Sequence, residues 1–145
     1  MLRHINPEAN VPKYTISAAA NLVGLSVHAI RKYEREGLII PFKKDSNQRL
    51  YTDSDIERLK CIRQTITEMS TEGIKRILSL IPCWSILHCG NSDRENCDAY
   101  TGYSKPCWVL KNKGEYCKEK DCRECQVYYS FGNCHSIKDK LKELL

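Results

Sequence analysis

The cysteines of this 145-residue chain are unevenly distributed, because eight of the nine follow Pro82. The eight are Cys83, Cys89, Cys97, Cys107, Cys117, Cys122, Cys125 and Cys134. A cysteine can form a disulfide, bind a soft metal as its thiolate, or react as a nucleophile. The residues after Pro82 therefore carry the material for a disulfide scaffold, a metal centre or a set of reactive thiols.

The spacing of these cysteines points to two kinds of metal centre. Structural zinc often uses two cysteines separated by two residues, and Cys122 with Cys125 is such a pair. The run Cys117-x4-Cys122-x2-Cys125 instead matches the plant-type ferredoxin arrangement for an iron–sulfur cluster, which needs a distant fourth cysteine. The pattern favours an iron–sulfur cluster, with zinc and metal-free thiols as alternatives. The predicted metal ligands are Cys83, Cys89, Cys97, Cys107, Cys117, Cys122 and Cys125, while His88 and His135 are interpreted as surface histidines.

The cysteine-rich segment contains an internal duplication. "PCWSIL" at 82–87 is echoed by "PCWVLK" at 106–111, and "CDAY" at 97–100 by "CQVY" at 125–128. Two copies of one unit predict two related half-sites that face each other. The pattern resembles the small two-CW module of prokaryotic proteins, a resemblance that implies no particular cofactor.

A segment of this size with few aliphatic residues buries little apolar area, and such small domains usually need a disulfide or a structural metal to stabilise them. Trp84 and Trp108 are expected to supply most of its buried area. The segment is therefore predicted to be a small cysteine-rich module stabilised by a metal.

The first half of the chain predicts two short helices joined by a tight turn. Ser17 is a candidate N-cap, Ala19, Leu22 and Val23 share one face, and Gly24 is suited to end the helix. A second helix is expected to begin after Ser26 and to end near Glu36, before Gly37. This is the outline of a helix-turn-helix.

The second helix carries a stripe of basic side chains at helical spacing, namely His28, Arg31, Lys32 and Arg35. Such a stripe is often only a solvated face. It is also what a recognition helix needs, because phosphates and guanine edges both attract Arg and Lys.

The segments that follow predict a hairpin and two more helices. "LIIPFKKDSNQRLYT" at 38–52 has a polar turn between two strand-like runs, and Thr52 with Asp55 forms a capping-box pattern. The third helix would bury its inner face, made of Ile56, Leu59, Ile62 and Ile66, and would hold Cys61 as a buried free thiol. Ser70 or Thr71 is expected to open a fourth helix.

Taken together, residues 13–82 resemble the DNA-binding domain of the MerR family of transcription regulators. The motifs that carry the resemblance are "AIRKYEREGLIIP", "NQRLYTDSDIERL" and "STEGIKRIL", and in detail they are similar to the HspR and GlnR branches. The resemblance implies a winged helix-turn-helix that contacts DNA. The residues it places at the DNA are Ser26, Val27, His28, Arg31, Tyr33, Arg49 and Tyr51. Lys32, where many family members have an aromatic residue, Arg35 of the same basic stripe and Lys43 are predicted to contact DNA as well.

The family resemblance also implies partners. It predicts a homodimer on an inverted-repeat operator in double-stranded DNA, with RNA polymerase as a further partner. Many relatives dimerise through a long helix after the fourth helix, whereas Pro82 interrupts the chain at that point here. The dimer contact is then expected from the first residues, the cysteine module or the closing "SIKDKLKELL".

Charge and hydropathy agree with a DNA-binding protein. Residues 1–82 carry 13 Lys and Arg against 9 Asp and Glu, and residues 83–145 carry 10 against 9. Neither an export signal nor an apolar run long enough to span a membrane is evident, so a cytoplasmic protein is expected. In a reducing compartment clustered cysteines more often bind metal than form disulfides.

The sequence therefore predicts a mainly α-helical protein with a winged helix-turn-helix followed by a cysteine-rich module. The expected parts are an N-terminal extension at 1–13, a DNA-binding domain at 14–82, the cysteine module at 83–135 and a C-terminal helix at 136–145. The predicted function is transcription regulation with a metal centre that senses redox state or metal. The alternatives are a regulator merely stapled by zinc and a redox or electron-transfer protein. No catalytic motif stands out, and an enzyme is not expected.

Overall fold

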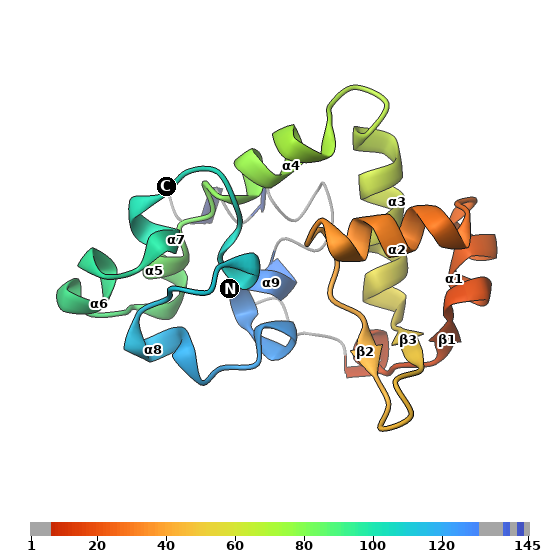
Figure 1. Ribbon diagram of the computed structural model, residues 1–145, viewed down its shortest axis with the longest axis horizontal. Helices are drawn as coiled ribbons and strands as arrows, with labels where there is room; N and C mark the ends of the chain where they lie inside the picture. Colours follow the sequence, from red (N-terminus) through yellow and green to blue (C-terminus); the bar gives the residue numbers. More distant parts are fainter. Residues whose placement is uncertain (1–6, 131–137, 140–141, 144–145) are drawn as a thin grey trace. The chain divides into compact units, whose positions relative to one another are not determined.

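The computed structural model describes residues 7–130, 138–139 and 142–143. The chain is mainly helical with one small sheet, as predicted, and it forms two compact units that divide between Gln64 and Thr65 (Figure 1). The predicted domain boundary at residue 82 stays a prediction, because this division places the fourth helix in the second unit. The helix predicted for 136–145 lies mostly outside the described residues.

The first unit begins with the short 3-10 helix η1 (Pro7–Asn10) and strand β1 (Tyr14–Thr15). Helix α1 (Ile16–Val23) follows, and its N-cap is Thr15, whose hydroxyl accepts a hydrogen bond from the Ala18 amide at 3.2 Å. The prediction of Ser17 as the cap is wrong by two positions. Thr15 takes this role because it has the extended backbone of an N-cap at the end of β1.

The predicted helix-turn-helix is confirmed. Gly24 ends α1 with φ of 76°, a left-handed conformation that favours glycine. Helix α2 (Val27–Arg35) then begins after Ser26, whose side chain accepts a hydrogen bond from the Ala29 amide at 3.0 Å. Gly37 follows the helix, again with positive φ.

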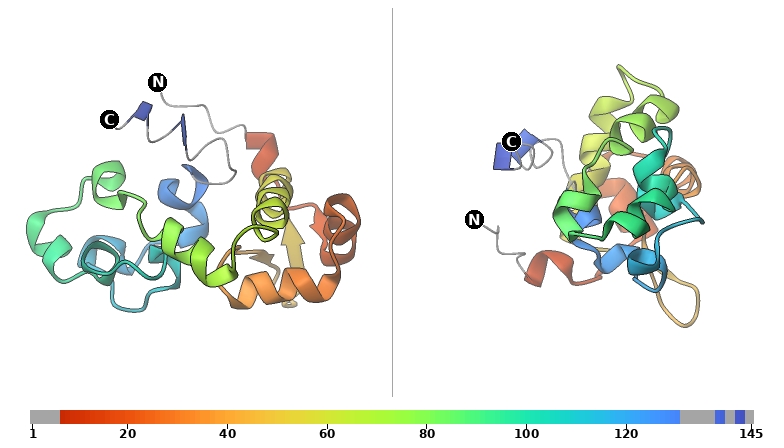
Figure 2. Two further views of the ribbon diagram at one scale, coloured as in Figure 1. Left: turned by 90° about the horizontal axis from the view of Figure 1, so that it is seen from above. Right: turned by 90° about the vertical axis from the view of Figure 1, so that its left-hand side faces the viewer.

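The wing is a small antiparallel sheet. Strand β2 (Phe42–Lys43) pairs with β3 (Arg49–Tyr51) to form the predicted hairpin, and β3 also pairs with β1. In both figures the turn between β2 and β3 extends away from the helices of its unit (Figure 2). The hairpin therefore presents its tip to solvent.

Helix α3 (Asp53–Thr65) supplies the central apolar side chains of the first unit. Its capping box is confirmed, because the Thr52 amide donates to Asp55 and the Asp55 amide donates to Thr52, at 2.9 and 3.0 Å. Ile56, Leu59 and Ile62 are buried, as predicted. Ile30, Leu38, Ile39 and Tyr51 are also buried in this unit, whereas Leu22 is 53% exposed, so its predicted inward position on α1 is wrong.

Cys61 also differs from its prediction. It was expected to be a buried free thiol, but it is half-buried and disulfide-bonded. The expectation followed from the general tendency of a helical cysteine to be buried as a small apolar residue, which does not bear on the bonding at a single position.

The second unit consists of short helices. Helix α4 (Thr71–Leu78) begins after Ser70, whose hydroxyl accepts from the Gly73 amide at 3.1 Å. The cysteine-rich segment follows with elements of three to five residues, namely α5 (Cys83–Leu87), α6 (Asn91–Glu95), α7 (Asp98–Thr101), η2 (Cys107–Val109), α8 (Glu115–Lys118), η3 (Cys122–Glu124) and α9 (Gln126–Ser130). Helix α5 packs against both α7 and α9. Among the described residues, no helix is both long enough and apolar enough to cross a bilayer.

Candidate nucleic-acid interface and cysteine cavity

The basic stripe of α2 faces solvent. His28, Arg31, Lys32 and Arg35 are all exposed, while Ile30 and Tyr33 point into the unit. Ser26 at the start of the helix and Lys43 on β2 are exposed as well, and Val27 is half-buried. The structure thus leaves most of the predicted DNA-contacting side chains free to meet a polyanion.

Glu34 joins the recognition helix to the wing, a role that the sequence did not suggest. The Arg49 Nε atom on β3 donates to the Glu34 carboxylate at 2.6 Å, and the Lys43 Nζ atom lies 3.7 Å from the same group. Only 15% of the Glu34 side chain is exposed, against 35% for Arg49. The signal in the sequence that could have indicated this role is that Glu34 is the one acidic residue of the basic helix α2. The ion pair fixes the hairpin relative to α2.

Two tyrosines predicted to contact DNA are buried instead. Tyr33 is 5% exposed and Tyr51 is fully buried, and the Tyr51 hydroxyl is itself inaccessible in this structure. Tyr33 belongs to the buried face of α2, and Tyr51 to the buried end of β3. Burial raises the pKa of Tyr51 to about 12, with the Glu34 carboxylate as a further cause. The Tyr51 hydroxyl has no hydrogen-bond partner among the described residues.

Replacing Tyr51 with phenylalanine is therefore expected to leave DNA affinity unchanged and to raise the free energy of unfolding by about 1 kcal/mol, because a buried unsatisfied hydroxyl is removed. Urea denaturation and a gel-shift titration on the same preparation would measure both quantities. A tenfold loss of affinity at unchanged stability would show that Tyr51 reaches DNA after all.

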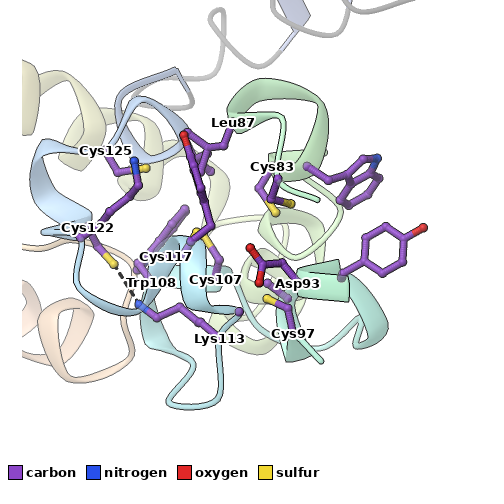
Figure 3. A pocket seen from close by; sticks show the side chains of 18 of the residues that line it. Cys83, Leu87, Asp93, Cys97, Cys107, Trp108, Lys113, Cys117, Cys122 and Cys125 are labelled. Carbon is purple, nitrogen blue, oxygen red and sulfur yellow. Dashed lines mark hydrogen bonds between the residues drawn. The ribbon is translucent and has the colours of Figure 1, made fainter. Parts of the chain in front are cut away.

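Seven cysteines line one cavity of about 40 Å³ in the second unit (Figure 3). They are Cys83, Cys89, Cys97, Cys107, Cys117, Cys122 and Cys125, the full set of predicted metal ligands. Each of them is half-buried, and none forms a disulfide. The cavity has room for a few water-sized groups. The structure thus brings all seven predicted ligands to one place, while His88 is not part of the lining.

The duplicated sequence has a duplicated structure. In the first copy the ring of Trp84 meets Tyr100 edge-on, at 5.1 Å between centroids and 86° between planes. In the second copy Trp108 meets Tyr128 in the same way, at 5.3 Å and 88°. All four rings belong to the cavity wall. The two copies therefore repeat one packing arrangement around a shared cavity.

Three thiols of the cavity have raised pKa values. Burial raises the pKa of Cys83 to about 11, and the neighbouring Cys97, Cys117 and Cys89 raise it further. Burial is also the main cause that raises the pKa values of Cys107 and Cys117. A bound cation would reverse this preference, because a coordinated thiol loses its proton.

The donor set suits a soft metal, since it consists of sulfur ligands shielded by aromatic rings. In the part of the chain that the structure describes, however, no three His, Cys, Asp or Glu side chains are close enough together to form a ready metal site. The cavity wall would have to contract around an ion.

Gly114 determines how closely the two copies approach. A Cβ atom added at Gly114 would lie 2.9 Å from the Asp93 carbonyl oxygen of the first copy. Nearby, the Asp98 amide donates to the Asn112 carbonyl at 3.0 Å. The absence of a side chain at Gly114 lets the second copy pack directly on the backbone of the first.

Replacing Gly114 with alanine is expected to lower the free energy of unfolding of the second unit by about 1–3 kcal/mol, because the added methyl group overpacks this contact. Gly90→Ala is the matched control. Gly90 is also a helix N-cap with nearly the same backbone angles, but among the described residues nothing lies within 4 Å of its added Cβ. Equal losses of stability in thermal unfolding of the two variants would contradict the steric explanation.

Comparison with known proteins agrees with the fold of residues 14–81. Residues 14–81 match the family described as "MerR HTH family regulatory protein". The HspR protein of Streptomyces coelicolor, named as a heat shock protein, is 38% identical over 73 residues, which are 49% of this chain and 48% of that protein. A protein of Haemophilus influenzae named as a heavy metal-dependent transcriptional regulator is 53% identical over 51 residues, 34% of this chain and 40% of the relative.

A third relative is GlnR of Bacillus anthracis, named as an HTH-type transcriptional regulator. It is 30% identical over 70 residues, 48% of this chain and 54% of GlnR. The chain thus spans about half the length of the relatives it matches. The helix-turn-helix, the wing and the sequence match agree, and residues 14–81 form a MerR-family helix-turn-helix domain.

Proposed function

We propose that this chain is a DNA-binding transcription regulator whose cysteine cavity binds a thiophilic metal centre. The observation that supports DNA binding is the exposed basic stripe on α2, the second helix of a MerR-family helix-turn-helix. His28 and Arg31 lie in its first half, which enters the major groove in helix-turn-helix proteins, and Arg35 and Lys32 continue the stripe.

The wing adds a second contact to the same DNA. Lys43 and Arg49 lie on neighbouring strands and both meet Glu34, so their positive charges are held beside α2. Such side chains suit phosphates on either side of the groove, which position a protein without reading sequence. Arg31 is then the base-reading residue and Arg49 the phosphate-contacting residue of the proposed interface.

Two copies of the chain on an inverted repeat form the proposed complex. Helix α4 ends at Leu78 and α5 begins at Cys83, so the described residues contain no long helix after α4 for a coiled coil. The two-fold arrangement and a contact with RNA polymerase come from the family resemblance, as does a cytoplasmic location. The names of two relatives, a heavy metal-dependent transcriptional regulator and an HTH-type transcriptional regulator, support the regulatory role.

Selection of bound sequences from a random duplex pool by the full chain tests the DNA-binding proposal. We expect an enriched inverted repeat, bound more weakly as the salt concentration rises. Arg49→Ala should weaken binding to selected and unrelated duplexes by similar factors. A pool that stays random, or binding that does not depend on salt, would contradict DNA binding as the function.

The metal part of the proposal rests on the seven cysteines around one cavity. An iron–sulfur cluster and zinc both take thiolate ligands, and they are separated by metal content, acid-labile sulfide and colour of anaerobically purified protein. Protein that contains neither metal after purification, and that binds none when reduced, would contradict this part. The DNA-binding proposal would stand. A redox enzyme, one form of the alternative function, would instead reduce disulfide substrates in a steady-state assay.

A further inference from the structure

The two copies of the cysteine unit correspond at their cysteine positions. Cys89 and Cys97 are eight positions apart, and Cys117 and Cys125 are also eight positions apart. Each copy begins with Pro-Cys-Trp and ends at the tyrosine that meets this tryptophan edge-on. The matched pairs are Cys83 with Cys107, Cys89 with Cys117, and Cys97 with Cys125. Each copy thus presents three matched sulfurs to the cavity.

Cys122 has no counterpart in the first copy. It follows Cys117 by five positions, and the residue at the same distance after Cys89 is Arg94. Its sulfur accepts a hydrogen bond from the Lys113 Nζ atom at 3.2 Å, drawn as a dashed line in Figure 3. Cys122 is therefore an addition to the six matched cysteines, and its sulfur already accepts a hydrogen bond from Lys113.

The number of matched sulfurs does not suit a single ion. A tetrahedral zinc ion takes four ligands, so one ion would leave two of the six matched cysteines without a metal. If that ion took two sulfurs from each copy, one matched pair of cysteines would remain without a metal. Two tetrahedral ions that share two thiolates need six sulfurs.

The positions of the cysteines agree with a shared centre. Cys83, Cys89 and Cys97 of the first copy line the same cavity as Cys107, Cys117 and Cys125 of the second. In Figure 3 the labelled cysteines lie around the cavity rather than at one point. The sulfurs of both copies are therefore within reach of one cavity, but no single ion position is already formed.

We propose that the cavity binds two zinc-type divalent ions in one thiolate centre, held by the six matched cysteines, with Cys122 outside the ligand set. This inference rests on the proposed metal-binding function and adds the number of ions and their ligands. Six thiolates carry more charge than two divalent ions. Arg94, Lys113 and Lys120 line the same cavity together with one carboxylate, that of Asp93, so the charged side chains of the lining leave a positive surplus that offsets the excess.

The first test uses the full chain, reduced and stripped of metal, and titrates it with Co²⁺ and then with Zn²⁺. We expect sulfur-to-cobalt absorption that saturates at two equivalents, displacement by two equivalents of zinc, and no acid-labile sulfide in the purified protein. Saturation at one equivalent would overturn the two-ion centre and leave the metal-binding proposal intact, as would iron with matching sulfide. Absence of binding would overturn both.

Single cysteine variants test the ligand set. Cys89→Ser and Cys117→Ser occupy matched positions, and each is expected to bind at most one ion tightly. Cys122→Ser changes a thiol of the same cavity and is expected to keep two. The proposal fails if Cys122→Ser loses an ion, because Cys122 is a ligand in the ferredoxin-type set and lies outside the set proposed here. The wild-type titration decides the stoichiometry even if a variant does not fold.

Discussion

Replacing Arg31 with alanine is expected to weaken binding to the selected operator by roughly 5- to 150-fold, the range for one lost base contact of about 1–3 kcal/mol. Arg31 is exposed on the outer face of α2, and its guanidinium can donate two parallel hydrogen bonds to a guanine. Gel-shift titration at fixed salt concentration would measure the change.

The expected loss should be specific to the operator. Binding of Arg31→Ala to an unrelated duplex should fall by a smaller factor, because only the positive charge is lost there. Lys60→Ala is the control. Lys60 is an exposed basic residue on α3, outside both α2 and the wing, and its Nζ atom lies 3.2 Å from the Glu57 carboxylate. Equal losses on both duplexes would assign Arg31 to phosphate contact rather than to base reading.

The largest expected loss of stability is at Leu59. This side chain is fully buried in the first unit, so Leu59→Ala should lower the free energy of unfolding by about 2–5 kcal/mol through lost burial and a residual cavity. Urea denaturation followed by far-UV circular dichroism would measure it.

Leu22→Ala is the matched control for this substitution. Leu22 is 53% exposed on α1, and the same chemical change there should alter stability by about 0.5 kcal/mol or less. Similar losses for the two variants would mean that Leu22 is covered in solution and that the first unit has a partner surface on α1.

Much of the first unit could be predicted because its signals are local. Ser26 and the pair Thr52 and Asp55 are caps that act within one helical turn, and Gly24 ends a helix through its own backbone angles. Each of these helix boundaries depends only on residues within a few positions of it, so the sequence alone is sufficient to predict where the helix begins or ends.

The errors lie where distant residues decide the outcome. Strand β1 has two residues, too few to show alternation, and it exists because β3 pairs with it. Leu22 has the right spacing for an inner face, but Ala20 faces the core instead. Tyr51 was expected at the DNA because of the family resemblance, and the tertiary structure buries the residue completely.

The sequence predicted which residues belong to the candidate sites better than it predicted which of them contact one another. The basic stripe of α2 followed from helical spacing, whereas the Glu34–Arg49 ion pair connects residues 15 positions apart and could not be read from either element alone. For the tail, the repeat predicted two facing half-sites. Which sulfurs approach one another depends on how short helices pack, and this has no periodic signal in the sequence.

The edge-on tryptophan pairs have a practical consequence. The chain contains two tryptophans, Trp84 and Trp108, and both belong to the cavity wall. The indole emission of the unmodified protein therefore originates beside the sulfurs and not in the helix-turn-helix. Zinc has a filled d shell and leaves such emission bright, whereas an iron–sulfur cluster quenches it. A spectrofluorimeter can thus follow the filling of this cavity in the presence of DNA, without any attached dye.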